Sequence, residues 1–165
     1  MWQKKIIEQE LKKVVDPLGI KVVELFVKEN KSGLTINVVI EKVGGVTIDD
    51  CEKVTRLLND RLSILDDFDI YNYRLQVSSP GLSRVFKSKE EFNIFKGRDV
   101  KIILKEPLDG LIQGEKVNKI SKIIENGHIL GGILLGIEDS MVKIKIDDEI
   151  VEIPYVKIQK TKLNG

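Results

Sequence analysis

The sequence predicts two small domains, an α+β domain over residues 1–83 and a small β-barrel over residues 84–165. Three observations predict this division. The first half carries helix-like and strand-like patterns in the order α-β-β-α-β. The second half is a succession of short strand patterns separated by turn residues, which is typical of a small barrel. Between the halves, an alternating apolar run stops at two serines, a Pro-Gly pair and an arginine.

The composition indicates a folded protein and limits its partners. Hydrophobic residues make up 42% and charged residues 32% of the 165 residues, which excludes a disordered chain. The net charge of +1 excludes a global basic field, so any RNA contact must come from local clusters. Cys51 is the only cysteine, which points to a reducing, cytoplasmic compartment. No apolar stretch is long enough to span a bilayer, so we expect no membrane role.

The first half begins with a one-sided helix that should end near Asp16-Pro17. Its expected apolar stripe is Trp2, Ile6, Leu11, Val15 and Leu18. Residues 20–28 and 34–42 are rich in β-branched and aromatic residues, and residues 29–33 have the composition of a hairpin loop. We therefore expect two antiparallel strands after the helix.

A second helix is predicted to begin at Thr47, whose hydroxyl can cap it, with Asp50 as the acidic partner of a capping box. Its expected buried stripe is Ile48, Cys51, Val54, Leu58 and Leu62. In that stripe Cys51 is a small core residue rather than a nucleophile. A third strand over residues 71–78 follows, because aromatic and aliphatic residues alternate there with polar ones.

The third strand leads into a predicted tight turn from Ser79 to Leu82. Pro80 and Gly81 would occupy its two central positions, because proline fixes its own φ and glycine permits a positive one. Such a turn either only connects the two domains or also presents a binding surface, and the sequence leaves both readings open.

The second half should contain a short helix within residues 87–95 and strands at 100–105, 129–137, 141–146 and 149–153. A helical turn at 154–156 is expected before a last strand at 157–161. The long loop at about 106–128 predicts an amphipathic helix whose polar face carries Lys116, Lys119 and Lys122. This face is either solvated or a weak candidate for an RNA contact.

No catalytic set is expected anywhere in the chain. The sequence has no phosphate-binding glycine loop with its lysine, no Cys or His pairs at zinc spacing, and no nucleophile with an identifiable base. We therefore expect no enzyme activity, no metal and no cofactor, and the residues alone indicate a two-domain binding protein.

Five separated motifs together resemble the ribosome maturation factor RimP family. They are GGVTIDDC at residues 44–51, SSPGLSR at 78–84, and the segments 92–97, 106–110 and 134–139. The resemblance implies an α+β domain followed by an SH3-like or Sm-like barrel. It also implies a cytoplasmic, non-enzymatic bacterial factor that binds the free small ribosomal subunit and promotes its maturation. Ribosomal RNA and ribosomal protein twelve of the small subunit are the implied partners, and we expect a monomer.

The resemblance also implies a set of binding or interdomain residues. Carried over by position, they are Gly44, Gly45, Asp49, Asp50, Ser78, Ser79, Pro80, Gly81 and Arg84. The serines would supply hydrogen bonds and the arginine a phosphate or interdomain contact. Ser83 stands where the family usually has Asp, and Val85 where it usually has Pro.

Two other functions stay open from the sequence. One is a general RNA-binding module, and the other is an adaptor whose barrel binds a basic ribosomal protein. The acidic residues available to such an adaptor are Asp147, Asp148, Glu149 and Glu152.

Overall fold

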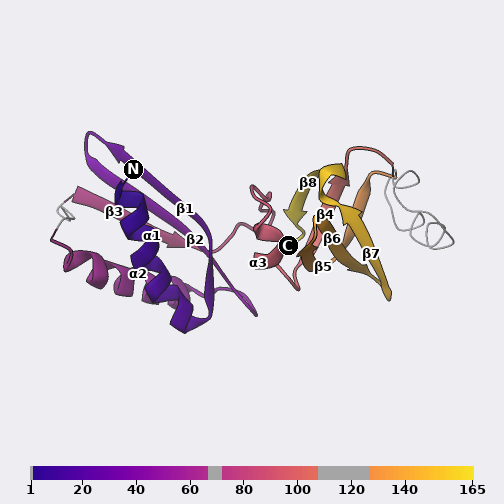
Figure 1. The fold of residues 1–165 in the computed structure, drawn as a ribbon. Coiled ribbons are helices and arrows are strands. Elements are labelled where there is room, and N and C mark those ends of the chain that lie inside the picture. Colours follow the sequence, from indigo (N-terminus) through magenta and orange to yellow (C-terminus); the bar gives the residue numbers. More distant parts are fainter. Residues whose placement is uncertain (1, 67–71, 108–126) are drawn as a thin grey trace. The chain divides into compact units, whose positions relative to one another are not determined.

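The computed structural model describes residues 2–66, 72–107 and 127–165. Its contacts divide the chain into two compact units, Met1–Pro80 and Gly81–Gly165 (Figure 1). We call them unit 1 and unit 2. None of the helices in the described ranges is long and apolar enough to cross a membrane.

Unit 1 consists of two helices and a three-stranded sheet. Its elements are α1 (Trp2–Val15), the short 3-10 helix η1 (Asp16–Leu18), β1 (Ile20–Asn30), β2 (Gly33–Lys42), α2 (Ile48–Ser63) and β3 (Tyr73–Ser78). The sheet order is β1-β2-β3, in which β1 and β2 are antiparallel whereas β2 and β3 are parallel. The predicted α-β-β-α-β order of the first half is therefore confirmed.

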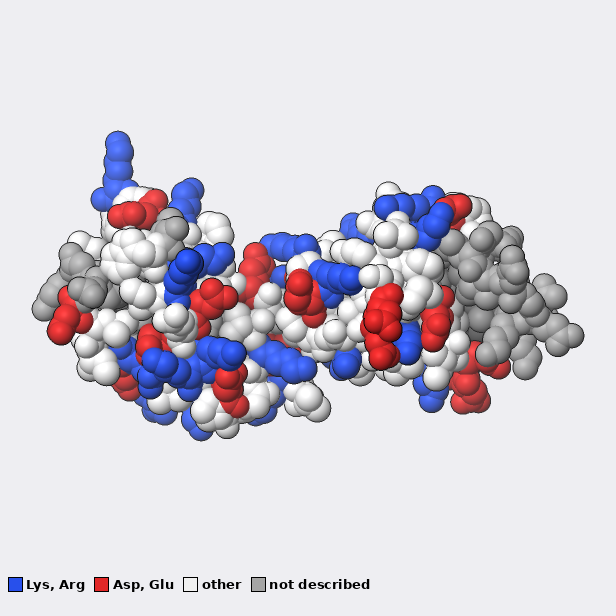
Figure 2. All heavy atoms as spheres, viewed as in Figure 1, with Lys and Arg blue, Asp and Glu red and all other residues white. Residues whose placement is uncertain are grey.

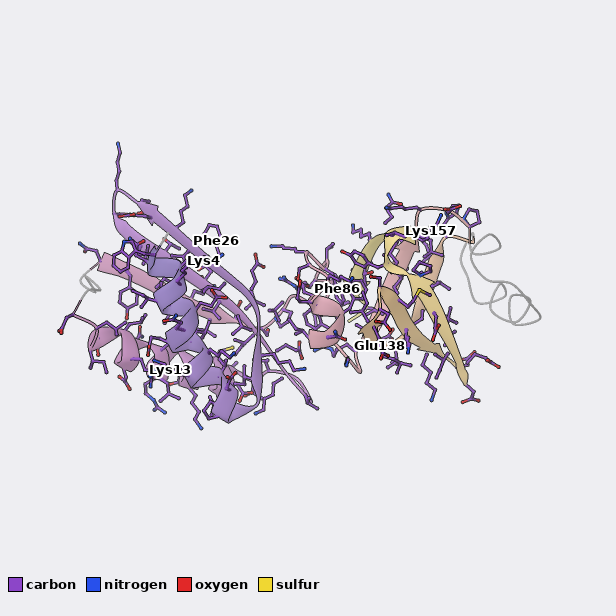
Figure 3. All side chains as sticks on the ribbon, viewed as in Figure 1. Lys4, Lys13, Phe26, Phe86, Glu138 and Lys157 are labelled. Atoms are coloured by element: carbon purple, nitrogen blue, oxygen red, sulfur yellow. The ribbon has the colours of Figure 1, made fainter. Side chains whose placement is uncertain are left out.

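The helices and the sheet of unit 1 enclose one hydrophobic core. Leu11 of α1 and Leu58 of α2 are buried with Ile36 and Val38 of β2. Glu10 of α1 accepts hydrogen bonds from Lys13 and Arg61, both at 2.6 Å, so an ion pair joins α1 to α2 beside this core. Lys13 is one of the residues labelled in Figure 3. The lysine bond is the main cause that lowers the pKa of Glu10, because it favours the ionised carboxyl.

Two apolar residues predicted to be buried in unit 1 are exposed. The exposed fraction is 53% for Trp2 and 86% for Ile48. Each is the first residue of its helix, and a first turn can extend past the sheet that covers the rest of the stripe. Ile7 and Val14, which the predicted stripe omitted, are buried instead.

Unit 2 consists of a short helix and five antiparallel strands. Its elements are α3 (Glu91–Ile94), β4 (Asp99–Leu104), β5 (Ile129–Glu138), β6 (Met141–Ile146), β7 (Glu149–Pro154), the 3-10 helix η4 (Tyr155–Lys157) and β8 (Ile158–Leu163). The sheet order is β7-β6-β5-β4-β8, and within the described ranges the two outer strands β7 and β8 do not pair. The described part of unit 2 is therefore an antiparallel sheet rather than a closed barrel.

The alternating pattern of β4 places its apolar residues in the core of unit 2. Val100, Ile102 and Leu104 are buried there, together with Leu134 of β5 and Val142 of β6. The helix predicted in the long loop, with Lys116, Lys119 and Lys122, falls in residues 108–126, which lie outside the described residues.

Candidate functional site

Seven of the nine candidate residues gather at one edge of unit 1. Strands β2 and β3 are parallel, so their carboxyl ends lie at the same edge of the sheet, where Val39 pairs with Ser78 (Figure 1). Helix α2 begins at this edge, because it connects the end of β2 to the start of β3. We call this set the carboxyl edge, and its members are Gly44, Gly45, Asp49, Asp50, Ser78, Ser79 and Pro80.

The two glycines form the turn between β2 and α2. Their φ angles are 84° for Gly44 and 95° for Gly45, in the left-handed region that favours glycine. The Gly45 N–H donates to the Lys42 carbonyl oxygen at 2.9 Å and closes the turn. A Cβ atom at either glycine would have no atom within 4 Å. The backbone conformation, and not crowding, therefore explains the glycines at these positions.

Asp50 holds the turn, the helix and the strand together. Its N–H donates to Thr47 Oγ1 at 3.1 Å, and its Oδ2 accepts from the Thr47 N–H at 2.9 Å, which confirms the predicted capping box. Lys42 Nζ lies 3.0 Å from the other carboxylate oxygen. The Thr47 N–H, followed by Lys42, lowers the pKa of Asp50 to about 2. The Asp50 carboxylate therefore serves to hold the local structure, whereas Asp49 is exposed.

Cys51 lies between the two halves of the carboxyl edge. The backbone of Ser79 lies close enough to its thiol to influence the pKa, so the end of β3 lies beside the first turn of α2. Burial, followed by the charge of Asp50, raises the pKa of the Cys51 thiol, so the reactive thiolate is disfavoured. Cys51 also packs against the core of unit 1. Both observations fit a packing residue rather than a nucleophile.

Two exposed apolar side chains border the glycine turn. Val43, which follows β2, is 93% exposed, and Ile48 at the start of α2 is 86% exposed. Val43 is not among the predicted site residues and Ile48 is predicted to be buried, although a valine beside two turn glycines indicates an exposed position. Together with the exposed Asp49, they give the carboxyl edge a mixed surface that suits contact with a macromolecule. No group of three metal-ligating side chains occurs in the described residues.

The remaining candidates, Gly81 and Arg84, belong to unit 2, and the turn there differs from the prediction. The Arg84 N–H donates to the Gly81 carbonyl oxygen at 3.0 Å, so Leu82 and Ser83 occupy the centre of the turn. Gly81 is not among the glycines with positive φ. The predicted turn with Pro80 and Gly81 at its centre is therefore wrong, because the φ that proline fixes is equally compatible with an extended chain.

The side chain of Arg84 is engaged within unit 2. Its Nε and Nη2 donate to the two carboxylate oxygens of Glu91 at 3.0 and 2.8 Å. The exposed fractions of these side chains are only 10% and 2%. The Glu91 carboxylate also accepts from the Lys87 N–H at 3.2 Å. The geometry therefore assigns Arg84 a structural role in holding α3 to the segment before it.

The carboxyl edge and the sheet below it fall within the part of the chain that resembles a known family. The family model described as the RimP N-terminal domain matches residues 10–83. These residues include β1, β2, α2, β3 and all seven members of the carboxyl edge. Residues 10–83 are therefore similar to the RimP N-terminal domain, and this match supports the RimP family of ribosome maturation factors.

Proposed function

We propose that the protein is a non-enzymatic assembly factor that binds the free small ribosomal subunit and promotes its maturation. The observation that carries this proposal is the family match, which includes every residue of the carboxyl edge. In this proposal ribosomal RNA and ribosomal protein twelve of the small subunit are the partners. The protein acts as a monomer in the cytoplasm, and the five-stranded sheet of unit 2 belongs to an SH3-like domain.

The carboxyl edge is the surface we propose for contact with the subunit. It combines the exposed carboxylate of Asp49 with the apolar side chains of Val43 and Ile48. A basic protein surface with an apolar patch complements these groups better than bare RNA does, because Asp49 would repel phosphates. Apolar side chains that become fully covered are the ones that contribute most to such an interface.

The distribution of charge argues against a general RNA-binding module. Basic and acidic side chains are interspersed over the visible face of each unit (Figure 2). On that face the mixture of charges gives no broad positive surface of the kind that drives sequence-independent binding, and the net charge of the whole chain is only +1. We therefore favour specific recognition of one assembly, the small ribosomal subunit, by a site of defined shape.

Co-sedimentation with purified small subunits, at low and at moderate salt, tests the proposal. We expect association with free small subunits under both conditions and little association with unrelated structured RNA. A protein that ignores free subunits at both salt concentrations would contradict the proposed function. Equal affinity for unrelated RNAs, with a steep dependence on salt, would instead identify a general RNA-binding module.

A matched pair of variants tests the role of the carboxyl edge. Ile48 and Ile64 lie at opposite ends of α2 and are both exposed, by 86% and 77%. We expect Ile48→Ser to weaken association with the subunit by about tenfold, whereas Ile64→Ser should leave it unchanged. Equal effects of the two variants would exclude this edge as the contact surface.

A second candidate function, the protein adaptor, is supported by the turn between β6 and β7. Asp147 and Asp148 are exposed there and could bind a basic segment of ribosomal protein twelve. Binding of that protein to the full chain without RNA, and its loss on Asp147→Asn with Asp148→Asn, would support this candidate. Undiminished binding by the double variant would exclude the turn.

A further inference from the structure

Unit 2 contains a pocket that lies outside the residues matched by the family model. Its volume is about 350 Å³, which is within the range of small-molecule sites. The lining residues are 86–88, 92, 105, 155–156 and 158–161. They come from the segment before α3, α3 itself, the residue after β4, η4 and β8.

One wall of the pocket is a packed aromatic cluster. Phe86, labelled beside α3 in Figure 3, stacks on Phe95 with ring centroids 5.0 Å apart and an interplanar angle of 30°. Phe92 meets Phe86 and Tyr155 edge to face, at 5.0 and 5.7 Å. Phe92 and Phe95 are buried, whereas Phe86 and Tyr155 are partly exposed. The buried rings therefore hold the two outer rings in fixed positions, so little order has to be gained when a planar ligand binds.

The charged groups that line the pocket all have the same sign. Lys87, Lys105 and Lys160 are lining residues, and no Asp or Glu is among them. In the described ranges, the ammonium groups of Lys105 and Lys160 make no ion pair. The nearby Glu106 is neutralised, because it pairs with Lys157. The pocket is therefore complementary to an anion.

Polar groups for hydrogen bonding are also present. Ser88 and Gln159 line the pocket and are exposed. Thr161, also a lining residue, is 3% exposed, and its Oγ1 has no hydrogen-bond partner in the described part of the chain. A buried hydroxyl without a partner is unfavourable, so a ligand that reaches it gains a hydrogen bond that the free protein lacks.

We propose that this pocket binds one nucleotide of single-stranded RNA. The base lies against Phe86 and Tyr155, and the adjoining phosphates lie against Lys105 and Lys160. A planar base with an anionic backbone matches all three features of the site, since stacking on aromatic rings and lysine contacts to phosphate are how single strands are bound. The inference rests on the proposed function, because the natural ligand would be ribosomal RNA of the immature subunit.

Fluorescence anisotropy with a labelled single-stranded twelve-nucleotide RNA tests the proposal on the full-length protein, without ribosomes. The test variant is Lys105→Gln with Lys160→Gln, which removes two charges from exposed side chains. The control is Lys31→Gln with Lys145→Gln, two exposed lysines outside the pocket. We expect the test variant to bind at least tenfold more weakly, with a salt slope reduced by about 1.4, as two lost phosphate contacts predict. The control should change affinity less than about twofold.

Amide and aromatic NMR signals provide the second readout. A nucleoside monophosphate should shift the signals of Phe86 and Tyr155 in the wild-type protein, and Thr161→Val should weaken this binding without unfolding the protein. An acidic peptide that shifts these signals where the nucleotide does not would overturn the proposal in favour of a peptide site. The proposal would also be overturned if the wild-type protein did not bind the RNA, or if the test variant bound it with unchanged affinity.

The test separates this inference from the proposed function. If the test variant loses RNA binding and the wild-type protein ignores free small subunits, the pocket assignment stands and the proposed function fails. If the wild-type protein sediments with subunits but does not bind the single-stranded RNA, the pocket assignment fails alone.

Discussion

At the scale of single residues, Arg84 and Glu91 form the most deeply buried ion pair among those described for this chain. Removing one partner of such a pair leaves the other charge buried and uncompensated. We expect Arg84→Ala to lower the free energy of unfolding by about 3–5 kcal/mol. Arg56→Ala, which removes an exposed arginine from α2, should change it by less than about 0.5 kcal/mol. Urea denaturation followed by circular dichroism measures both.

A double substitution distinguishes this role of Arg84 from a contact with a partner. Arg84→Met with Glu91→Leu removes both charges and keeps apolar volume, so stability should recover to near the wild-type value. If this variant is stable and still sediments with the small subunit, the arginine is structural. Loss of sedimentation with full stability would make it a contact residue.

The ionisation of Asp50 makes the stability of unit 1 depend on pH. Its pKa is lowered from the ordinary value of 3.8 to about 2, chiefly by the Thr47 N–H. A group whose pKa is depressed in the folded state stabilises the fold fully above its unfolded pKa and loses that contribution as the pH falls. We therefore expect the stability difference between wild type and Asp50→Asn to be constant above pH 3.8 and to vanish towards pH 2. Thermal unfolding across this range measures it, and a difference that persists at pH 2 would contradict the assignment.

At the scale of elements, variants of the glycine turn between β2 and α2 test whether its glycines are required by the backbone conformation rather than by binding. Gly45 has a φ of 95°, which L-residues other than Asn and Asp rarely adopt. Gly45→Ala should cost about 1–2 kcal/mol, whereas Gly45→Asn should cost less than Gly45→Ala. Chemical denaturation of the two variants measures the difference. Equal costs would mean that the left-handed conformation is not the reason for this glycine.

The order of the elements was predictable because their signals are local. Alternation in Val100, Ile102 and Leu104, and the capping residues Thr47 and Asp50, each act within a few positions of the chain. These signals placed β6 at the residues where it is observed and β2 within one residue of its observed start. Local propensity agrees there with the final fold.

The relations between elements were not predictable in the same way. The exposure of Ile48 depends on where α2 begins relative to the sheet edge. The periodicity of apolar residues gives no information about that position. The engagement of Arg84 depends on Glu91, seven residues away on another element. The parallel pairing of β2 with β3 brings the residues of the carboxyl edge together. The sequence indicates which residues these are, but not that they lie close to one another. The pocket of unit 2 likewise combines segments that no single motif joins.

At the scale of the whole molecule, the division between Pro80 and Gly81 predicts two separate unfolding transitions. Leu58 and Ile102 are fully buried, one in each unit. We expect Leu58→Ala to lower the stability of unit 1 alone and Ile102→Ala that of unit 2 alone, each by about 2–5 kcal/mol. Differential scanning calorimetry of the full chain measures both transitions. If either variant shifts both transitions equally, the units unfold as one.

The parallel pairing of β2 with β3 also has a consequence for the order of folding. Strands β1 and β2 are joined by two residues and can pair early, whereas β3 pairs only after the chain has passed through α2. In stopped-flow kinetics, Val27→Ala in β1 should slow folding, whereas Leu75→Ala in β3 should mainly accelerate unfolding. The carboxyl edge is complete only once β3 has paired with β2, so a newly synthesised chain acquires its proposed subunit-binding surface only after residues 73–78 have joined the sheet.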